Sequence, residues 1–98
     1  MSDNGMAVRP DGTVELSGAL TFETVPRFFV QSGSWINGAG AITVNLKSVT
    51  RVDSAGVALL LEWRERTRAA GRELTFTDLP EQLRHMIRVS GLDAAFAL

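Results

Sequence analysis

Apolar and polar residues alternate along four segments of the chain, and this period of two predicts β-strands. The first two segments flank the run Pro10-Asp11-Gly12, whose residue types favour a tight turn, so they are expected to form an antiparallel hairpin. Because the alternation leaves polar residues on one side, helices are expected to cover only one face of the sheet fully. The four predicted strands are 6–9, 13–18, 41–46 and 73–77.

Three other segments carry apolar residues at the spacing of an α-helix. In the first of them, Thr21 is the predicted N-cap. The spacing of the apolar residues directs Phe22, Val25 and Phe29 towards the core. The Gly-rich loop that follows leaves open whether Trp35 packs on the core or is exposed.

The second and third helices are predicted at 54–70 and 79–90, each followed by a glycine at the usual end position. In the third helix, one apolar face is predicted, formed by Leu83, Met86, Ile87 and Ser90. The resulting order, β-β-α-β-α-β-α, predicts an α/β fold with a single mixed, mainly parallel sheet and an antiparallel opening hairpin. One domain is expected over 1–98, with 1–5 disordered and the apolar tail packed down.

The composition is typical of a compact globular domain with a net charge close to zero. Of the 98 residues, 45% are hydrophobic, and ten basic against eleven acidic side chains leave a net charge of −1. No basic stripe indicates a nucleic-acid partner, and no apolar run approaches the roughly 20 residues that span a bilayer. The absence of cysteine excludes disulfides and thiolate sites. We therefore expect a soluble, cytoplasmic protein without direct membrane insertion.

The run Asp53-Ser54-Ala55-Gly56 stands between an apolar strand and the longest helix. Asp53 is a natural N-cap, and Ser54 falls in the first turn, where free backbone N–H groups and the helix dipole favour an oxygen or an anion. One interpretation is a plain helix cap. The other is a phosphoacceptor, because a phosphate on Ser54 would be tolerated beside the positive end of the helix. The local chemistry permits both.

The same helix carries a pair of large apolar residues on its polar side. At 100° per residue, Leu59 and Trp63 fall among Glu62 and Arg66, away from the centre of the core-facing arc. An outward aromatic of this kind predicts a docking patch for a protein partner. The alternative is that Trp63 lies over the rim of the core.

Three segments carry a family resemblance that covers nearly the whole chain. The run 52–61 (VDSAGVALLL), the earlier 14–21 (VELSGALT) and the late Ser90-Gly91-Leu92 resemble the STAS domain family. The resemblance implies the α/β fold described above. It also implies a candidate phosphoacceptor, because in the anti-sigma factor antagonists of that family the serine after the aspartate is phosphorylated, and this position is Ser54.

Two departures from the pattern of the anti-sigma factor antagonists indicate a resemblance to a narrower branch of the family. The antagonists usually have an acidic residue where this chain has Leu20-Thr21, and a second Ser or Thr where it has Ala55. The chain resembles the MlaB-like branch instead, the small STAS subunits of an ABC transporter that moves phospholipids and maintains outer-membrane lipid asymmetry.

The MlaB-like resemblance implies binding to the cytoplasmic ATPase subunit, within a complex that also holds permease and substrate-binding subunits, peripheral to the inner membrane. The implied function is to support assembly or activity of the ATPase, without touching lipid. The expected partner surface surrounds Ser54 and comprises Asp53, Ala55, Gly56, Leu59, Glu62, Trp63 and Arg66.

Other chemistry finds little support in the sequence. His85 is the only histidine, has no carboxylate pair at ligand spacing beside it, and is expected to be exposed, so neither a metal site nor a catalytic triad is predicted. No phosphate-binding loop is present, and no cofactor or small-molecule substrate is expected. An enzyme is therefore not predicted. Two hypotheses remain: a transporter accessory subunit, or an anti-sigma factor antagonist regulated by phosphorylation of Ser54.

Overall fold

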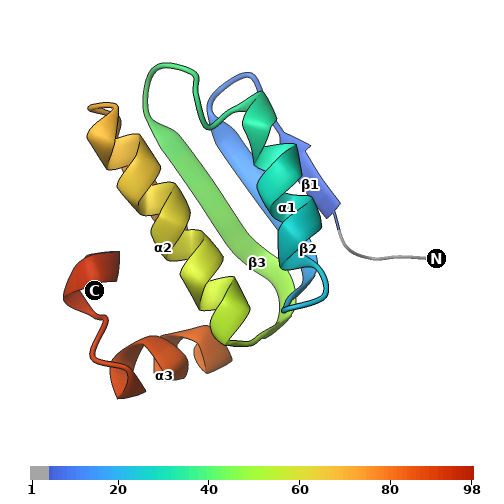
Figure 1. Ribbon diagram of the computed structural model, residues 1–98, viewed down its shortest axis with the longest axis vertical. Helices are drawn as coiled ribbons and strands as arrows, with labels where there is room; N and C mark the ends of the chain where they lie inside the picture. The colour runs from blue at the N-terminus through green and yellow to red at the C-terminus, as the bar shows by residue number, and fades with distance from the viewer. Residues whose placement is uncertain (1–4) are drawn as a thin grey trace.

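The computed structural model describes residues 5–98 and has the predicted element order. Among these residues it contains one four-stranded sheet, three α-helices and two short 3-10 helices (Figure 1). None of its helices is both long and apolar enough to cross a membrane in the part of the chain described. The elements are β1 (Gly5–Val8), β2 (Thr13–Leu20), α1 (Val25–Gln31), η1 (Ser32–Ser34), β3 (Ile42–Val52), α2 (Ser54–Ala69), β4 (Leu74–Thr77), α3 (Glu81–Val89) and η2 (Ala94–Phe96).

The strands lie in the order β1-β2-β3-β4, which confirms the predicted mixed sheet. β1 and β2 form the antiparallel hairpin, while β2 with β3 and β3 with β4 are parallel. In register, Val14 lies opposite Val44, and Val44 lies opposite Phe76. The aligned apolar residues form one continuous face towards the helices.

Helices α1 and α2 lie side by side over the same face of this sheet (Figure 1). Along β2, every second residue is buried, and the residues between them are only half-buried. The opposite face carries polar residues, and across β2 and β3 Thr13 pairs with Thr43 and Glu15 with Asn45. The prediction that only one face of the sheet is fully covered is thus confirmed.

β3 is longer than the sequence predicted. The prediction ended the strand at residue 46 and made 48–53 a connection, but the strand continues to Val52. It does so because its second half pairs with the end of β2, where Leu20 lies opposite Val52. At two register shifts β3 has one residue more than β2, between Asn45 and Ser48 and between Val49 and Arg51, and these extra residues interrupt the strict alternation from which the end of β3 was predicted.

The start of α1 also differs from the prediction. Thr24 rather than Thr21 is the N-cap, and its hydroxyl accepts from the Thr21 N–H at 3.0 Å and donates to the Ala19 carbonyl at 2.6 Å. Because α1 begins only at Val25, Phe22 lies outside the helix and the helical spacing assumed from Phe22 does not apply. As a result Phe28 fills the core, whereas Phe22 is 79% and Phe29 39% exposed, contrary to expectation.

The core between sheet and helices is built around two tryptophans. Trp35, whose position the sequence left open, is only 5% exposed. Its ring lies 5.0 Å from that of Trp63, edge to face at 70°. The Arg72 guanidinium holds the loop that carries Trp35, donating to the carbonyl oxygens of Trp35 at 2.9 Å, Ile36 at 3.1 Å and Gly40 at 2.8 Å.

The first and last described segments of the chain pack at opposite edges of the sheet, β1 as one edge strand and the C-terminal tail beside β4. In α3, Leu83 and Ile87 are buried as predicted, but Ser90 follows the helix and is exposed. The tail packs through Phe96, which contacts Phe76 with ring centroids 5.6 Å apart. At the other end, Gly5 belongs to β1, so the disorder expected over 1–5 is wrong there. Residues 1–4 of that prediction lie outside the described residues.

Candidate functional site

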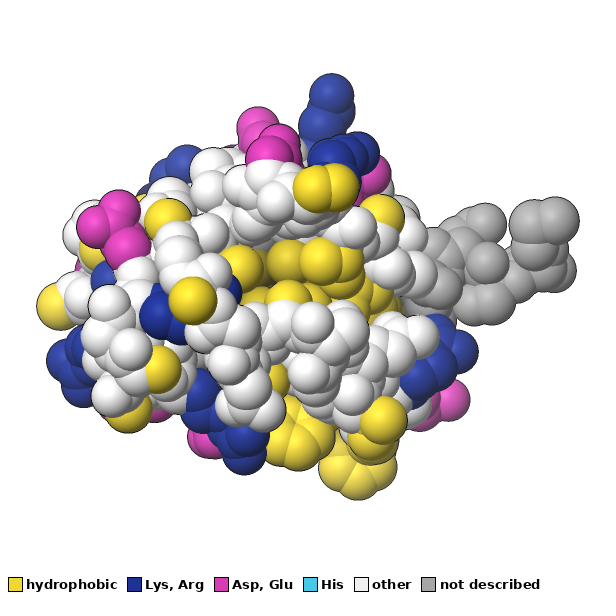
Figure 2. Space-filling model, turned by 90° about the horizontal axis from the view of Figure 1, so that it is seen from above, with side chains coloured by type: hydrophobic (Ala, Val, Ile, Leu, Met, Phe, Trp, Pro, Cys, Tyr) yellow, Lys and Arg dark blue, Asp and Glu magenta, His cyan; other side chains and the backbone are white. Residues whose placement is uncertain are grey.

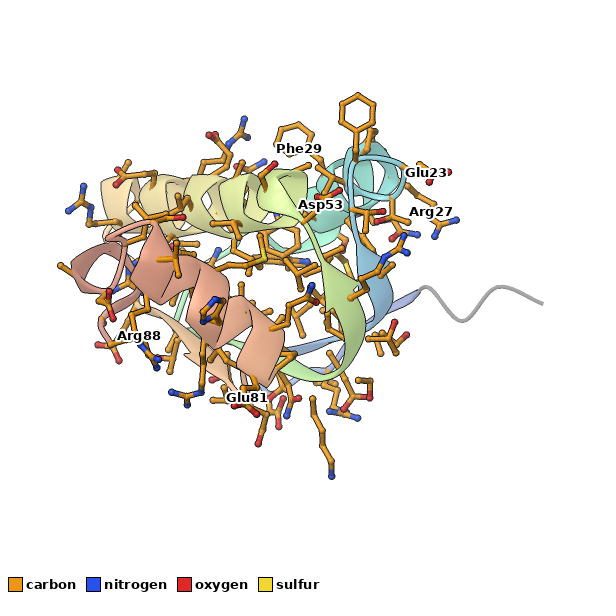
Figure 3. All side chains as sticks on the ribbon, turned by 90° about the horizontal axis from the view of Figure 1, so that it is seen from below. Glu23, Arg27, Phe29, Asp53, Glu81 and Arg88 are labelled. Atoms are coloured by element: carbon orange, nitrogen blue, oxygen red, sulfur yellow. The ribbon has the colours of Figure 1, made fainter. Side chains whose placement is uncertain are left out.

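Asp53 joins the first turn of α2 to the segment that enters α1. As the predicted N-cap, it accepts through Oδ1 from the backbone N–H groups of Ala55 at 2.9 Å and Gly56 at 3.3 Å. Its other oxygen, Oδ2, accepts from the Phe22 N–H at 3.0 Å. Figure 3 shows Asp53 at the start of α2, close to α1. One carboxylate therefore binds both helical segments.

These hydrogen bonds favour the charged form of Asp53. The bond from the Phe22 N–H is the main reason that the pKa of this carboxyl lies below its ordinary value of 3.8. Partial desolvation opposes the shift, and the bonds from Gly56 and Ala55 add to it. The first turn of α2 thus presents a permanent anion at neutral pH.

Gly56 allows this turn to lie directly against the end of the sheet. A Cβ at this position would collide with the Leu20 carbonyl oxygen and would lie 2.9 Å from both Leu20 Cβ and Val52 Cγ1. Any larger residue would push α2 away from β2 and β3. The glycine in the motif is therefore required by packing.

Ser54 is the first residue of α2 and is exposed. Its backbone stands beside the Asp53 carboxylate, and its hydroxyl is accessible to solvent or to a partner. This placement is compatible with both interpretations of the sequence, a plain cap region and a phosphoacceptor.

An open groove of about 670 Å³ runs between α1 and α2 next to this turn. Its walls are mostly apolar, and Phe22 and Phe29 stand at its α1 side. Hydrophobic side chains project from the side of the molecule that carries these helices (Figure 2), and Phe29 points outward from it (Figure 3). We name it the α1–α2 groove; it is lined by Phe22, Val25, Pro26, Phe29, Ala55, Ala58, Leu59, Glu62 and Arg66.

Charged residues of α2 border the groove. Arg66 binds Glu62 with an Nε–Oε2 distance of 2.7 Å, and its guanidinium carbon lies 4.9 Å from the centre of the Phe29 ring. An apolar floor with a charged border is the usual arrangement of a protein-binding surface.

The structure separates the sequence-predicted site residues into two groups. Ala55, Leu59, Glu62 and Arg66 line the groove, while Asp53 and Gly56 shape the turn at its end. The predicted outward Leu59–Trp63 patch is wrong. Leu59 is 4% exposed and contributes only to the groove floor, and Trp63 is fully buried against Trp35.

Sequence reasoning missed the α1 side of the groove. It assigned Phe22 and Phe29 to the core and gave no role to Pro26; on the α2 side it gave none to Ala58. The available signal was the number of large apolar residues within 22–30, which exceeds what one face of a short helix can bury: Phe22, Val25, Phe28, Phe29 and Val30. His85 is exposed as predicted, and no group of three or more metal-binding side chains occurs in the described part of the chain.

A family model described as Mlab, STAS domain matches residues 7–98. The chain belongs to the STAS domain family. Within it the chain is MlaB-like, as the sequence resemblance indicated. STAS domains are generally regulatory or interaction domains rather than enzymes. The α1–α2 groove and Ser54 therefore lie on a domain whose family acts through contacts with other proteins or domains.

Solved structures share the STAS fold. SpoIIAA of Bacillus in its phosphorylated form superposes with a TM-score of 0.71 at 20% identity, over 93% of this chain and 86% of that one. A candidate anti-sigma factor antagonist from Thermotoga maritima gives 0.77 at 18% identity, over 93% and 80%. A sulfate transporter family protein from Wolinella succinogenes gives 0.72 at 18% identity, over 92% and 75%. No curated protein sequence matches this chain.

Proposed function

We propose that this STAS domain is a non-enzymatic accessory subunit that binds the ATPase subunit of a phospholipid-transporting ABC complex. The observation that carries the proposal is the open, apolar α1–α2 groove beside Ser54 on a MlaB-like domain. Bound there, the domain supports assembly or activity of the ATPase and thereby the maintenance of outer-membrane lipid asymmetry.

The physical support comes from the aromatic side chains that are exposed at the groove. Within the described residues, Phe22 is largely exposed and Phe29 partly so, and exposed aromatic anchors often dominate the energy of an interface. The Glu62–Arg66 pair at the border offers charged contacts of both signs. In this role the domain contacts protein rather than lipid, and it is peripheral to the inner membrane through the complex.

The test is a binding titration of the purified Mla-type ATPase from the same cells, by calorimetry. Phe22→Ala should lower the affinity by about tenfold or more, as expected for an aromatic anchor. Val89→Ala is the matched control, because Val89 on α3 is similarly exposed, at 72%, and does not line the groove. An unchanged affinity of Phe22→Ala, with the variant folded, would contradict the groove as the docking surface.

A second candidate function is an anti-sigma factor antagonist controlled by phosphorylation of Ser54. It is supported by the exposed position of Ser54 at the start of α2 and by the likeness in fold to SpoIIAA, which has phosphorylated and unphosphorylated forms. Intact-mass analysis of the chain purified from its native cells tests this candidate. The expected result is a mass increase of one phosphate that is absent in Ser54→Ala. A chain that carries no phosphate under any growth condition contradicts this candidate.

A further inference from the structure

We propose that Asp53 is the positioning residue of the α1–α2 groove, because its carboxylate fixes the Phe22 backbone to the first turn of α2. The importance of the groove for binding rests on the proposed function, but the positioning itself is a property of the domain alone. Asp53 is thereby assigned a role beyond that of a helix cap.

The geometry divides the carboxylate between two tasks. Oδ1 accepts from Ala55 and Gly56 and caps α2. Oδ2 accepts from the Phe22 N–H at 3.0 Å, across 31 residues of sequence. In addition, the backbone N–H of Asp53 donates to the Leu20 carbonyl at 3.1 Å.

Capping alone does not account for this arrangement. A helix cap requires one side-chain oxygen, and Asn or Ser serves as well as Asp. Only a carboxylate presents a second oxygen that can accept from the Phe22 N–H while the first caps α2. The second hydrogen bond joins the two walls of the groove, since Phe22 stands on one side and Ala55 on the other.

Phe22 requires such an external constraint. Its side chain is largely exposed, so packing contributes little to holding its position. It precedes the Thr24 cap of α1 and lies outside both β2 and α1. A residue fixed before binding loses less conformational entropy on docking, which is the advantage of a preorganised surface. The charge-assisted bond to Asp53 supplies this constraint from the backbone.

Asp53→Asn separates the two tasks. The amide oxygen can still cap α2, but the amide NH₂ group cannot accept from the Phe22 N–H. Asp11→Asn is the matched control, because the Asp11 carboxylate also accepts from a backbone N–H, that of Thr13 at 3.0 Å, on the hairpin away from the groove. Asp53→Ser is a second cap-competent variant that presents a single oxygen, for use if the Asn variant does not fold.

The first experiment measures amide hydrogen exchange by NMR on the domain alone. In Asp53→Asn, the protection of the Phe22 amide should fall by about tenfold or more, as for loss of a charge-assisted hydrogen bond. The amides of Ala55 and Gly56 should stay protected, and Asp11→Asn should leave Phe22 unchanged. Unchanged protection of Phe22 in both Asp53 variants would overturn the positioning role.

The second experiment is a double-mutant cycle on binding to the Mla-type ATPase. Asp53→Asn should weaken binding, and it should have no further effect when combined with Phe22→Ala, because it acts through Phe22. Additive losses would overturn the proposal. If Phe22→Ala alone binds normally, the proposed function fails, while the exchange experiment still decides whether Asp53 fixes Phe22.

Discussion

The two ends of α2 are each held by one charged side chain that binds backbone groups of a distant segment. Before the helix, the Asp53 anion accepts from N–H groups, including that of Phe22. After the helix, the Arg72 cation donates to carbonyl oxygens of the loop 35–40. Each sign also suits the helix dipole at its end.

The segments that these side chains hold differ in burial. Arg72 binds the loop whose Trp35 and Ile36 are buried in the core. Asp53 binds the segment whose Phe22 is largely exposed. The same type of interaction therefore stabilises the core at one end and organises a surface at the other. Substitutions should reduce the free energy of unfolding most at the Arg72 end.

Trp63→Ala is expected to have the largest effect on stability. Trp63 is fully buried and packs on Trp35, so its removal leaves a large cavity at the Arg72 end. The free energy of unfolding should fall by about 3–5 kcal/mol, measured by urea denaturation. Val30→Ala, at an exposed residue, should lie within about 0.5 kcal/mol of wild type. A small loss for Trp63→Ala would mean that the ring is not a core residue.

Arg72→Met should have an intermediate effect. It removes the donors to the Trp35, Ile36 and Gly40 carbonyls and should lower the free energy of unfolding by about 2–3 kcal/mol, by the same measurement. Arg68→Met is the control, because Arg68 forms only an exposed pair with Glu65 and should change stability by less than about 0.5 kcal/mol. Equal losses of unfolding free energy in the two variants would contradict the proposed role of Arg72 in holding the loop.

At the Asp53 end of α2, the main expected effect is a dependence of the free energy of unfolding on pH. The pKa of Asp53 is lower in the folded chain than the ordinary value of 3.8, chiefly through the Phe22 bond, so its contribution to stability is present above that value and is lost as the pH falls through the folded pKa. Wild type should therefore lose more stability between about pH 5 and pH 2.5 than Asp53→Asn does.

Urea midpoints at each pH measure this difference. Asp11→Asn provides a comparison, because the Thr13 backbone N–H lowers the pKa of Asp11 too. It should flatten the acid dependence as Asp53→Asn does, but without loosening the Phe22 amide. Parallel pH curves for wild type and Asp53→Asn would show that the Phe22 bond does not stabilise the ionised carboxylate.

The sequence predicted the features that depend on neighbouring residues. The helix at 54–70 is confirmed to within a residue as Ser54–Ala69, and Asp53 is its cap as predicted. Both are local, since a capping side chain and a glycine end act within one turn of the helix. The hairpin and the parallel strands also follow from local alternation and element order.

The features that depend on contacts between segments distant in the sequence could not be predicted. Trp63 was placed on the polar side of α2, or over the rim of the core, because at 100° per residue it falls away from the centre of the core-facing arc. In the structure Trp35 covers the side of α2 on which Trp63 lies, so the apolar arc is wider than one sheet requires. Phe22 was misassigned because the Thr21 carbonyl accepts from the N–H groups of Thr24 and Val25, so a turn precedes α1 and Phe22 lies outside the helix.

The strand order has a consequence for where this groove can lie. From β2 through β3 to β4 the sheet advances in one direction without reversal. Right-handed crossovers, the rule for such connections, then require both crossover helices to occupy the same side as adjacent neighbours. A reversal of strand order would place them on opposite sides and abolish the crevice. The position of the α1–α2 groove is thus a property of the topology, and substitutions can change its lining without moving it.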